Sequence, residues 1–202
     1  MKILLTAFEP FGGERVNPAM EAVLRVTGED VIKLYLPVEY ETAAKLVLGK
    51  LSECKPDAVL CVGQAGGRTG VTPENCARNL RDSASPDSAG RLCRSEPVVP
   101  GAPETLYSTF DAGGMTEYLK DKGFPAYASS SAGTYVCNDV FYSVMYALGG
   151  THVPAGFIHV PFCTEQLALH PQAFALSTDE ITAALEAALD FIRMKHKKEV
   201  NA

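Results

Sequence analysis

Short apolar runs of strand length alternate with longer amphipathic stretches along most of this chain, and no other feature constrains its fold as strongly. Repeated switching between a buried strand and a helix builds a layered α/β domain, because each helix must cover a face of a largely parallel sheet. The pattern therefore predicts an α/β fold in a single domain over residues 1–202, with a mostly parallel, twisted sheet and helices on both faces. Strands or extended segments are expected at residues 2–7, 30–37, 58–62, 74–82, around 127 and 155–160. Helices are expected at residues 18–26, 40–54, 112–122, 135–148 and 179–196.

Residues 83–103 interrupt this alternation. The segment is rich in Pro, Gly, Ser and Asp and has no sustained period, so a long loop is expected there. Loops of this length inside a domain usually serve a function or are mobile.

Charge and cysteine content exclude several classes of protein. The 18 basic and 24 acidic side chains are scattered and give a net charge of -6, so no broad positive surface for nucleic acid is expected. The apolar run in the opening "MKILLTAFEPFGG" is too short for a signal-peptide core or a membrane span. Six cysteines without a CxxC pair indicate free thiols in a reducing compartment. We expect a cytoplasmic protein without a structural metal, a nucleic-acid partner or a membrane partner.

Cys137 stands in "SAGTYVCNDVFY", just behind a turn and at the start of an apolar helical pattern. With Thr134 as the expected N-cap, the thiol would lie in the first helical turn, where the helix dipole favours an anion. A free cysteine titrates near ~8.5, so only about 3% is thiolate at neutral pH, and a dipole effect of roughly 0.3–1 kcal/mol is too small to change that much. A nucleophile here therefore needs a base, and the alternative is a buried packing cysteine.

His159 is the histidine best placed to be that base. It lies in "AGFIHVPF", near the carboxyl end of an expected strand, and ligand crevices of open α/β sheets form at that edge. A hydrogen-bonded core histidine is the alternative. The sequence favours solvated positions for His152, His170 and His196.

A carboxylate to orient the imidazole is not singled out by the pattern. Glu74 is preferred only because it follows the Gly-rich segment after the third strand, and a solvated turn residue is equally compatible. The other acidic residues near strand or loop ends are Glu9, Asp82, Asp87, Asp139 and Glu165.

Four motifs in this order resemble the pyroglutamyl peptidase I family of cysteine peptidases, also called pyrrolidone-carboxylate peptidases. They are "LLTAFEPFGGERVNPAMEAV", "VGQAGGRTGVTPE", "SAGTYVCNDVFY" and "FIHVPF", and the resemblance covers nearly the whole chain. It implies removal of N-terminal pyroglutamate from peptides by a single catalytic domain, without a cofactor or metal, in a homotetramer.

The resemblance also implies roles for individual residues. Cys137 would be the nucleophile, His159 its general base and Glu74 the residue that orients the imidazole. Phe8 and Phe11 would flank the substrate ring, and the backbone around Gln64 would help to bind it. From spacing alone, core filling by the phenylalanines and a tight turn in the Gly-rich segment are favoured over these roles.

Two departures from the family pattern stand out. Ala84 occupies a position where an arginine is expected, and Gly113 and Gly114 fall in a predicted helix, where each glycine costs about 1 kcal/mol relative to alanine. Two alternative functions therefore stay open at this point. One is a non-catalytic small-molecule binding protein on the same scaffold, and the other is a thiol amidase of altered specificity.

Overall fold

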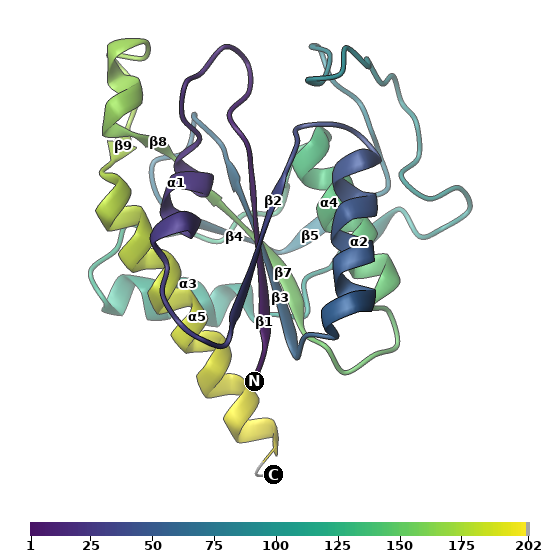
Figure 1. Cartoon of the computed structure of the whole chain (residues 1–202), viewed down its shortest axis with the longest axis vertical. Coiled ribbons are helices and arrows are strands. Elements are labelled where there is room, and N and C mark those ends of the chain that lie inside the picture. Colours follow the sequence, from purple (N-terminus) through teal and green to yellow (C-terminus); the bar gives the residue numbers. More distant parts are fainter. Residues whose placement is uncertain (201–202) are drawn as a thin grey trace.

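A five-stranded sheet forms the centre of the computed structural model, which describes residues 1–200 and side chains up to residue 197 (Figure 1). The strand order is β2-β1-β3-β7-β4. The four longer strands run parallel, and the short β4 is antiparallel at the edge. The strands in chain order are β1 (Ile3–Phe8), β2 (Val31–Leu36), β3 (Ala58–Gln64), β4 (Thr72–Glu74) and β7 (Ala155–Val160).

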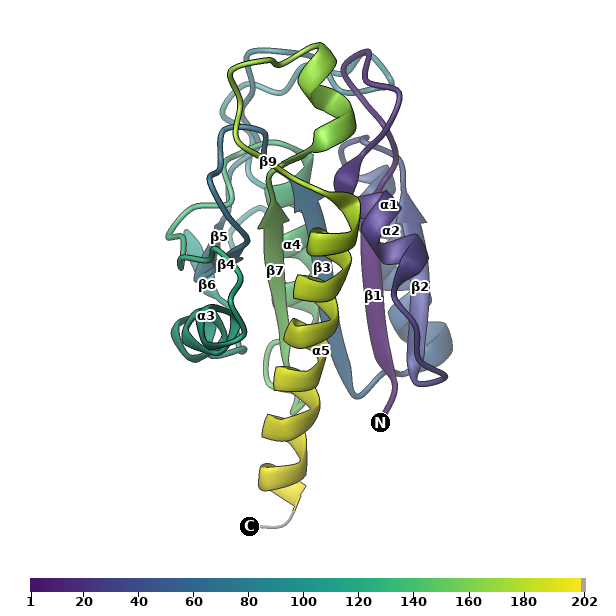
Figure 2. The same ribbon diagram turned by 90° about the vertical axis from the view of Figure 1, so that its left-hand side faces the viewer.

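Helices cover both faces of this sheet, as Figures 1 and 2 show. Side chains of α1, α3 and α5 pack on one face, and those of α2 and α4 pack on the other. The helices are α1 (Pro18–Arg25), α2 (Thr42–Cys54), α3 (Ala112–Asp121), α4 (Val136–Ala147) and α5 (Thr178–Val200). The fold class predicted from the sequence is confirmed.

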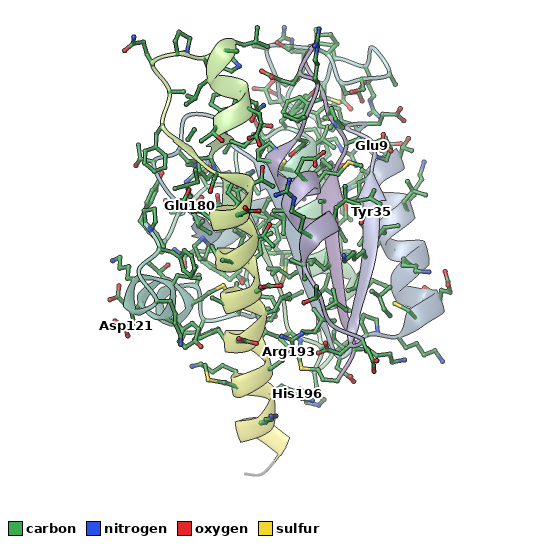
Figure 3. The ribbon with its side chains drawn as sticks, turned by 60° about the vertical axis from the view of Figure 1, so that its left-hand side comes forward. Glu9, Tyr35, Asp121, Glu180, Arg193 and His196 are labelled. Carbon is green, nitrogen blue, oxygen red and sulfur yellow. The ribbon has the colours of Figure 1, made fainter. Side chains whose placement is uncertain are left out.

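Burial on both faces explains why the central strands read as continuous apolar runs. All six residues of β1 and all six of β7 are buried. Successive side chains of a strand point to opposite faces, so Leu5 joins the core under α1 and α5 while Leu4 and Phe8 join the core under α2 and α4. At the end of the sheet opposite Glu9, Arg193 of α5 bonds both carboxylate oxygens of Asp30 just before β2 (Figure 3).

Most predicted elements are confirmed to within a few residues, but two are wrong. No strand forms around Tyr127; residues 126 and 129 make only isolated bridges to Val71 and Glu74. The extended segment expected at 74–82 is divided, because β4 ends at Glu74 and β5 (Cys76–Arg78) pairs instead with β6 (Thr105–Tyr107). The short strands β8 (Phe162–Cys163) and β9 (Ala175–Leu176) and the 3-10 helix η1 (Thr164–Ala168) complete the fold.

Gly114 in α3 has a local cause. Asp111 caps this helix, and its Oδ1 accepts a hydrogen bond from the Gly114 backbone N–H at 2.8 Å. A Cβ at residue 114 would lie 2.3 Å from the Asp111 Oδ2, so any other residue there would make the capping side chain shift. The lower helix propensity is thus offset by capping.

The long segment 83–103 is tied to the domain by a network of ion pairs. The Arg81 Nε lies 2.6 Å from the Asp139 Oδ1 of α4, and the Asp139 side chain is fully buried. Arg91 joins Glu41, at the start of α2, to Glu96 at 2.8 Å each. The Asp87 carboxylate of the segment also accepts from the Tyr40 backbone N–H at 2.8 Å, and these contacts set its path beside α2 and α4.

Ala84 lies in the long segment 83–103, and nothing in the structure explains the alanine at that position. No helix within residues 1–200 is both long and apolar enough to cross a bilayer. The domain bounds 1–202 stay a prediction, since residues 201–202 lie outside the described part of the chain.

Arg81→Met is expected to lower the free energy of unfolding by about 3–5 kcal/mol, because it leaves the Asp139 carboxylate buried without its cation. Urea denaturation followed by circular dichroism measures the loss. Arg25→Met is the matched control: its pair with Asp179 is 48% and 88% exposed, and less than about 1 kcal/mol is expected there. Equal losses in the two variants would contradict the assigned role of the buried pair.

Candidate active site

The topology opens a crevice at the carboxyl ends of β1 and β3. The chain passes from β1 to β2 on one side and then to β3 on the other, and ligands of open α/β sheets bind where the strand order reverses in this way. Phe8 ends β1, Gln64 ends β3, and His159 is the penultimate residue of β7. Three of the residues suggested by the sequence therefore reach the same edge.

The antiparallel edge strand brings Glu74 to His159. Thr72 pairs with His159 and Glu74 with Phe157 in the β4–β7 register, so the Glu74 side chain emerges on the same face as the imidazole. The His159 Nδ1 lies 2.8 Å from the Glu74 Oε1, and the two residues are 4% and 1% exposed. A carboxylate can only accept, so Nδ1 carries the proton and Nε2 keeps a free lone pair. The Nε2 of His159 can therefore accept a proton.

Arg68, which the sequence did not single out, completes this pair. Its Nη2 donates to the Glu74 Oε1 at 2.8 Å and to the Ser131 backbone carbonyl at 3.1 Å. The guanidinium compensates the buried charge of Glu74 and connects it to the turn that leads into α4. The "GGR" of the Gly-rich segment was the available signal, but only the fold shows which carboxylate it meets.

Cys137 is the second residue of α4, as the helical pattern predicted. The expected N-cap is wrong, however: Tyr135 occupies that position without a side-chain cap. The Thr134 hydroxyl instead donates to the Asp82 carbonyl at 2.6 Å, because the turn at 131–134 is bonded to the start of the long segment. The first backbone N–H groups of the helix are therefore not used by a capping side chain.

Gly63 allows the Cys137 thiol to lie on the same face of the sheet as His159. Gly63 and His159 pair in the β3–β7 register, on neighbouring strands that lie about 4.8 Å apart. A Cβ at residue 63 would be only 2.8 Å from the Cys137 Sγ and 2.9 Å from the Phe157 Cζ. The thiol thus sits directly on the backbone of Gly63, on the face of the sheet that carries the imidazole.

Burial raises the pKa of the Cys137 thiol to about 12, and the nearby negative charge of Glu74 acts in the same direction. This outweighs the preference for a thiolate that a helix N-terminus provides. The thiol therefore keeps its proton at neutral pH until a base removes it. A thiolate at Cys137 therefore requires a neighbouring base, and His159 lines the same cavity.

A cavity of about 190 Å³ contains Cys137 and His159. Cavities for drug-sized ligands measure roughly 300–1,000 Å³, so this one suits a single small ring. Phe8, Phe11 and Gln64 line it, as suggested by the resemblance, together with residues that the sequence did not indicate. These are Asn17, Val38, Ala65, Ala132 and Tyr135.

Asn17 and Tyr135 were detectable only in part from the sequence. Asn17 precedes Pro18 as a helix cap should, and its Oδ1 accepts from the Ala19 N–H at 3.0 Å. Tyr135 donates its hydroxyl to the Pro86 carbonyl at 3.0 Å, a contact between segments 49 residues apart. The residues next to Tyr135 in the sequence give no indication of a contact with such a distant segment.

The remaining candidates lie elsewhere. Asp87 holds the long segment and Asp139 pairs with Arg81, as described above. His170 is not solvated as expected: its ring stacks on Phe162 at 4.1 Å, and its Nε2 lies 2.5 Å from the Glu14 Oε1. Among residues 1–197, no group of three or more His, Cys, Asp or Glu side chains is arranged to hold a metal ion.

Comparison with known proteins agrees with this geometry. A family model described as pyroglutamyl peptidase matches residues 1–195. A pyrrolidone-carboxylate peptidase of Chromobacterium violaceum is 41% identical over 202 residues, which cover 98% of this chain and 95% of the relative. Another, from Thermococcus onnurineus, is 43% identical over 185 residues, covering 88% and 92%.

Solved structures are similar over the same range. Pyroglutamyl peptidase I from Bacillus amyloliquefaciens aligns with a TM-score of 0.89 at 38% identity, covering 93% of this chain and 92% of that one. Pyrrolidone carboxyl peptidase from Pyrococcus furiosus aligns with a TM-score of 0.90 at 34% identity, covering 96% and 99%. The resemblance found in the four sequence motifs is confirmed, and the chain belongs to the pyroglutamyl peptidase family.

Proposed function

We propose that this protein is a cysteine peptidase that removes an N-terminal L-pyroglutamyl residue from peptides. The observation that carries the proposal is the Glu74–His159 pair facing Cys137 in a cavity sized for one small ring, within a chain of the pyroglutamyl peptidase family. Family membership favours hydrolysis over a non-catalytic binding role.

The composition of the cavity supports a neutral ring as substrate. Among the described residues that line it, none is a carboxylate, a lysine or an arginine. A free N-terminal ammonium would find no anion to pair with, whereas a pyroglutamyl lactam carries no charge. Phe8 and Phe11 supply apolar surface for the flat ring, and the backbone around Gln64 supplies polar contacts.

The proposed reaction begins with proton transfer from Cys137 to the Nε2 of His159. The thiolate attacks the carbonyl carbon that joins pyroglutamate to the next residue, and backbone N–H groups at the start of α4 stabilise the oxyanion. The imidazolium gives its proton to the leaving amine as the C–N bond breaks, which leaves a thioester. Water, deprotonated by His159, then hydrolyses the thioester and releases pyroglutamate.

Glu74 and Arg68 act through the imidazole. Glu74 keeps the Nδ1 proton in place and stabilises the imidazolium without taking its proton. Arg68 holds the buried Glu74 carboxylate, whose Oε2 has no hydrogen-bond partner among the residues that the structure describes. Arg68 is therefore a positioning residue in this proposal.

Assembly, location and cofactor use rest on the sequence and its resemblance to the family. A homotetramer in the cytoplasm that needs no cofactor or metal is part of the proposal. Light scattering of the purified protein tests the tetramer.

Cys137→Ala is expected to abolish hydrolysis of a pyroglutamyl-coumarin amide, because no other atom in the cavity can form the thioester. Circular dichroism should show an unchanged fold. Cys54→Ala, at the end of α2, is the control and should keep full activity. Wild-type turnover by the Cys137 variant would refute the mechanism.

The pH dependence of Cys137 alkylation by iodoacetamide tests the role of His159. Because the pKa of the thiol is raised to about 12, His159→Ala should react slowly at neutral pH, and its rate should rise with pH until the thiol ionises. The wild-type protein should react faster at neutral pH, since the imidazole takes the proton. Identical pH profiles would contradict the assignment of His159 as base.

Arg68→Met is expected to lower kcat roughly 10–100-fold with a smaller effect on KM, since the loss of the guanidinium misplaces Glu74 and hence the imidazole. Arg68→Lys should restore part of the loss. Glu74→Gln should lower kcat further, and the double variant should be little worse than Glu74→Gln alone because both act through one group. Arg78→Met, an exposed arginine on β5, is the control. Additive losses would show that Arg68 acts independently of Glu74.

Gly63→Ala is expected to reduce kcat at least tenfold in a folded protein, because the added methyl group would push the Cys137 Sγ away from its seat. Gly49→Ala, where the new methyl group meets nothing within 4 Å, should leave turnover unchanged. Full activity of the Gly63 variant would show that the thiol does not react from this position.

A further inference from the structure

The loop after β1 carries Phe11 to the wall of the active-site cavity on a tight turn. The Glu14 backbone N–H donates to the Phe11 carbonyl at 3.1 Å, and Gly12 and Gly13 between them have φ angles of 65° and 83°. Two successive positive φ angles under such a bond are typical of a type I′ β-turn, which glycine favours. The two ends of a β-turn lie less than about 7 Å apart. The position of Glu14 therefore restricts that of Phe11.

Glu14 also attaches this loop to the rest of the domain. Among the described residues, it is the only member of the stretch 10–15 whose hydrogen bonds reach outside that stretch. Its Oε1 lies 2.5 Å from the His170 Nε2, in the segment between η1 and β9, which Figure 2 shows beside the loop. This hydrogen bond holds the pKa of Glu14 below its usual value, so the carboxylate is an acceptor and the Nε2 donates.

The His170 ring is itself supported by packing. It stacks on the Phe162 ring, with centroids 4.1 Å apart and planes at 12°. The Phe162 ring in turn lies on Gly66, where an added Cβ would be 2.1 Å from the Phe162 Cζ. Gly66 directly follows Gln64 and Ala65, which line the active-site cavity. His170 thus connects the loop after β1 to the Gly-rich segment after β3, and both of these segments line that cavity.

We propose that His170 is a positioning residue for substrate binding, which holds the Phe11 ring against the pyroglutamyl ring through Glu14 and the turn at 11–14. The inference rests on the proposed function and deepens it, because it adds a residue that sets the affinity for the ring. Without the bond, the substrate itself would have to order a loop with two adjacent glycines, and that ordering weakens binding. His170 does not touch the reacting atoms, so the chemical step is unaffected.

His170→Ala and Glu14→Ala break the bond from opposite sides. Each should raise KM for a pyroglutamyl-coumarin amide about three- to tenfold and change kcat less than about twofold, because Phe11 contacts the ring equally in the ground state and the transition state. Glu14→Gln keeps an acceptor oxygen for the imidazole and should restore part of the loss. A folding defect in one of the two alanine variants leaves the test to the other.

Matched controls come from neighbouring and similar side chains. Arg15→Ala changes the exposed residue next to Glu14, and His152→Ala changes an exposed histidine before β7. Both variants should keep the wild-type KM.

A double variant shows whether His170 acts through Phe11. Phe11→Ala alone should raise KM, and His170→Ala added to Phe11→Ala should raise it no further. A general disturbance of the domain by loss of His170 would instead add its effect to that of Phe11→Ala.

Protection of Cys137 from iodoacetamide by 2-pyrrolidone gives a second measurement that needs no turnover. This lactam has the ring of the substrate without the scissile bond. The His170→Ala variant should need about three- to tenfold more 2-pyrrolidone for the same protection. Its alkylation rate without 2-pyrrolidone should equal that of the wild-type protein.

The outcomes separate this inference from the proposed function. Unchanged KM and unchanged protection in folded His170→Ala or Glu14→Ala protein, or losses that add to that of Phe11→Ala, would overturn the inference and leave the peptidase activity standing. Absence of pyroglutamyl hydrolysis by the wild-type protein would overturn the proposed function itself. In that case, protection by 2-pyrrolidone that His170→Ala weakens would still support the inference, and equal protection or none would refute it.

Discussion

The hydrogen bond between the His159 Nδ1 and the Glu74 Oε1 is the constraint on which the rest of the site depends. It fixes the tautomer of the imidazole, and the tautomer decides which ring nitrogen can act as base toward Cys137. The bond exists because β4 runs antiparallel to β7 at the edge of an otherwise parallel sheet. A parallel strand at that place would need a long crossover connection, whereas this short strand follows directly from the Gly-rich segment after β3. The antiparallel direction of β4 thus brings the Glu74 carboxylate to His159.

Burial of the cavity opposes the role proposed for Cys137 as a nucleophile. The cavity is small and mostly apolar, and burial raises the pKa of the Cys137 thiol to about 12. A helix N-terminus alone is too weak to counter this, since its effect at ordinary sites is about 0.3–1 kcal/mol. The imidazole must therefore lie beside the sulfur, and Gly63 permits that by having no side chain. The proposed activation of the thiol thus depends on packing at Gly63 as well as on charge.

Local sequence patterns were sufficient for the fold and for part of the site. Apolar runs with strand spacing identified β1, β3 and β7, and the 3.6-residue pattern identified α4 with Cys137 at its start. The sequence patterns did not show which distant segments contact one another. Glu74 could not be separated from the other acidic residues because its partner lies 85 residues away. Thr134 has the chemistry of an N-cap, but a bond to Asp82 draws its hydroxyl elsewhere. The segment around Tyr127 has strand composition and bonds to the backbone of residues 71–75, but these contacts form only isolated bridges and no strand.

The proposed catalytic residues and the walls of the cavity differ in how well sequence patterns locate them. The proposed nucleophile and base stand on a helix start and a strand end, which periodic patterns locate. The walls of the cavity come from segments whose positions depend on distant contacts. Tyr135 is held by the carbonyl of Pro86, and the long segment that carries Pro86 is fixed through Asp87 to the start of α2. The shape of the cavity therefore depends on contacts between loops, and we expect substitutions there to alter it while the arrangement of Cys137, His159 and Glu74 stays the same.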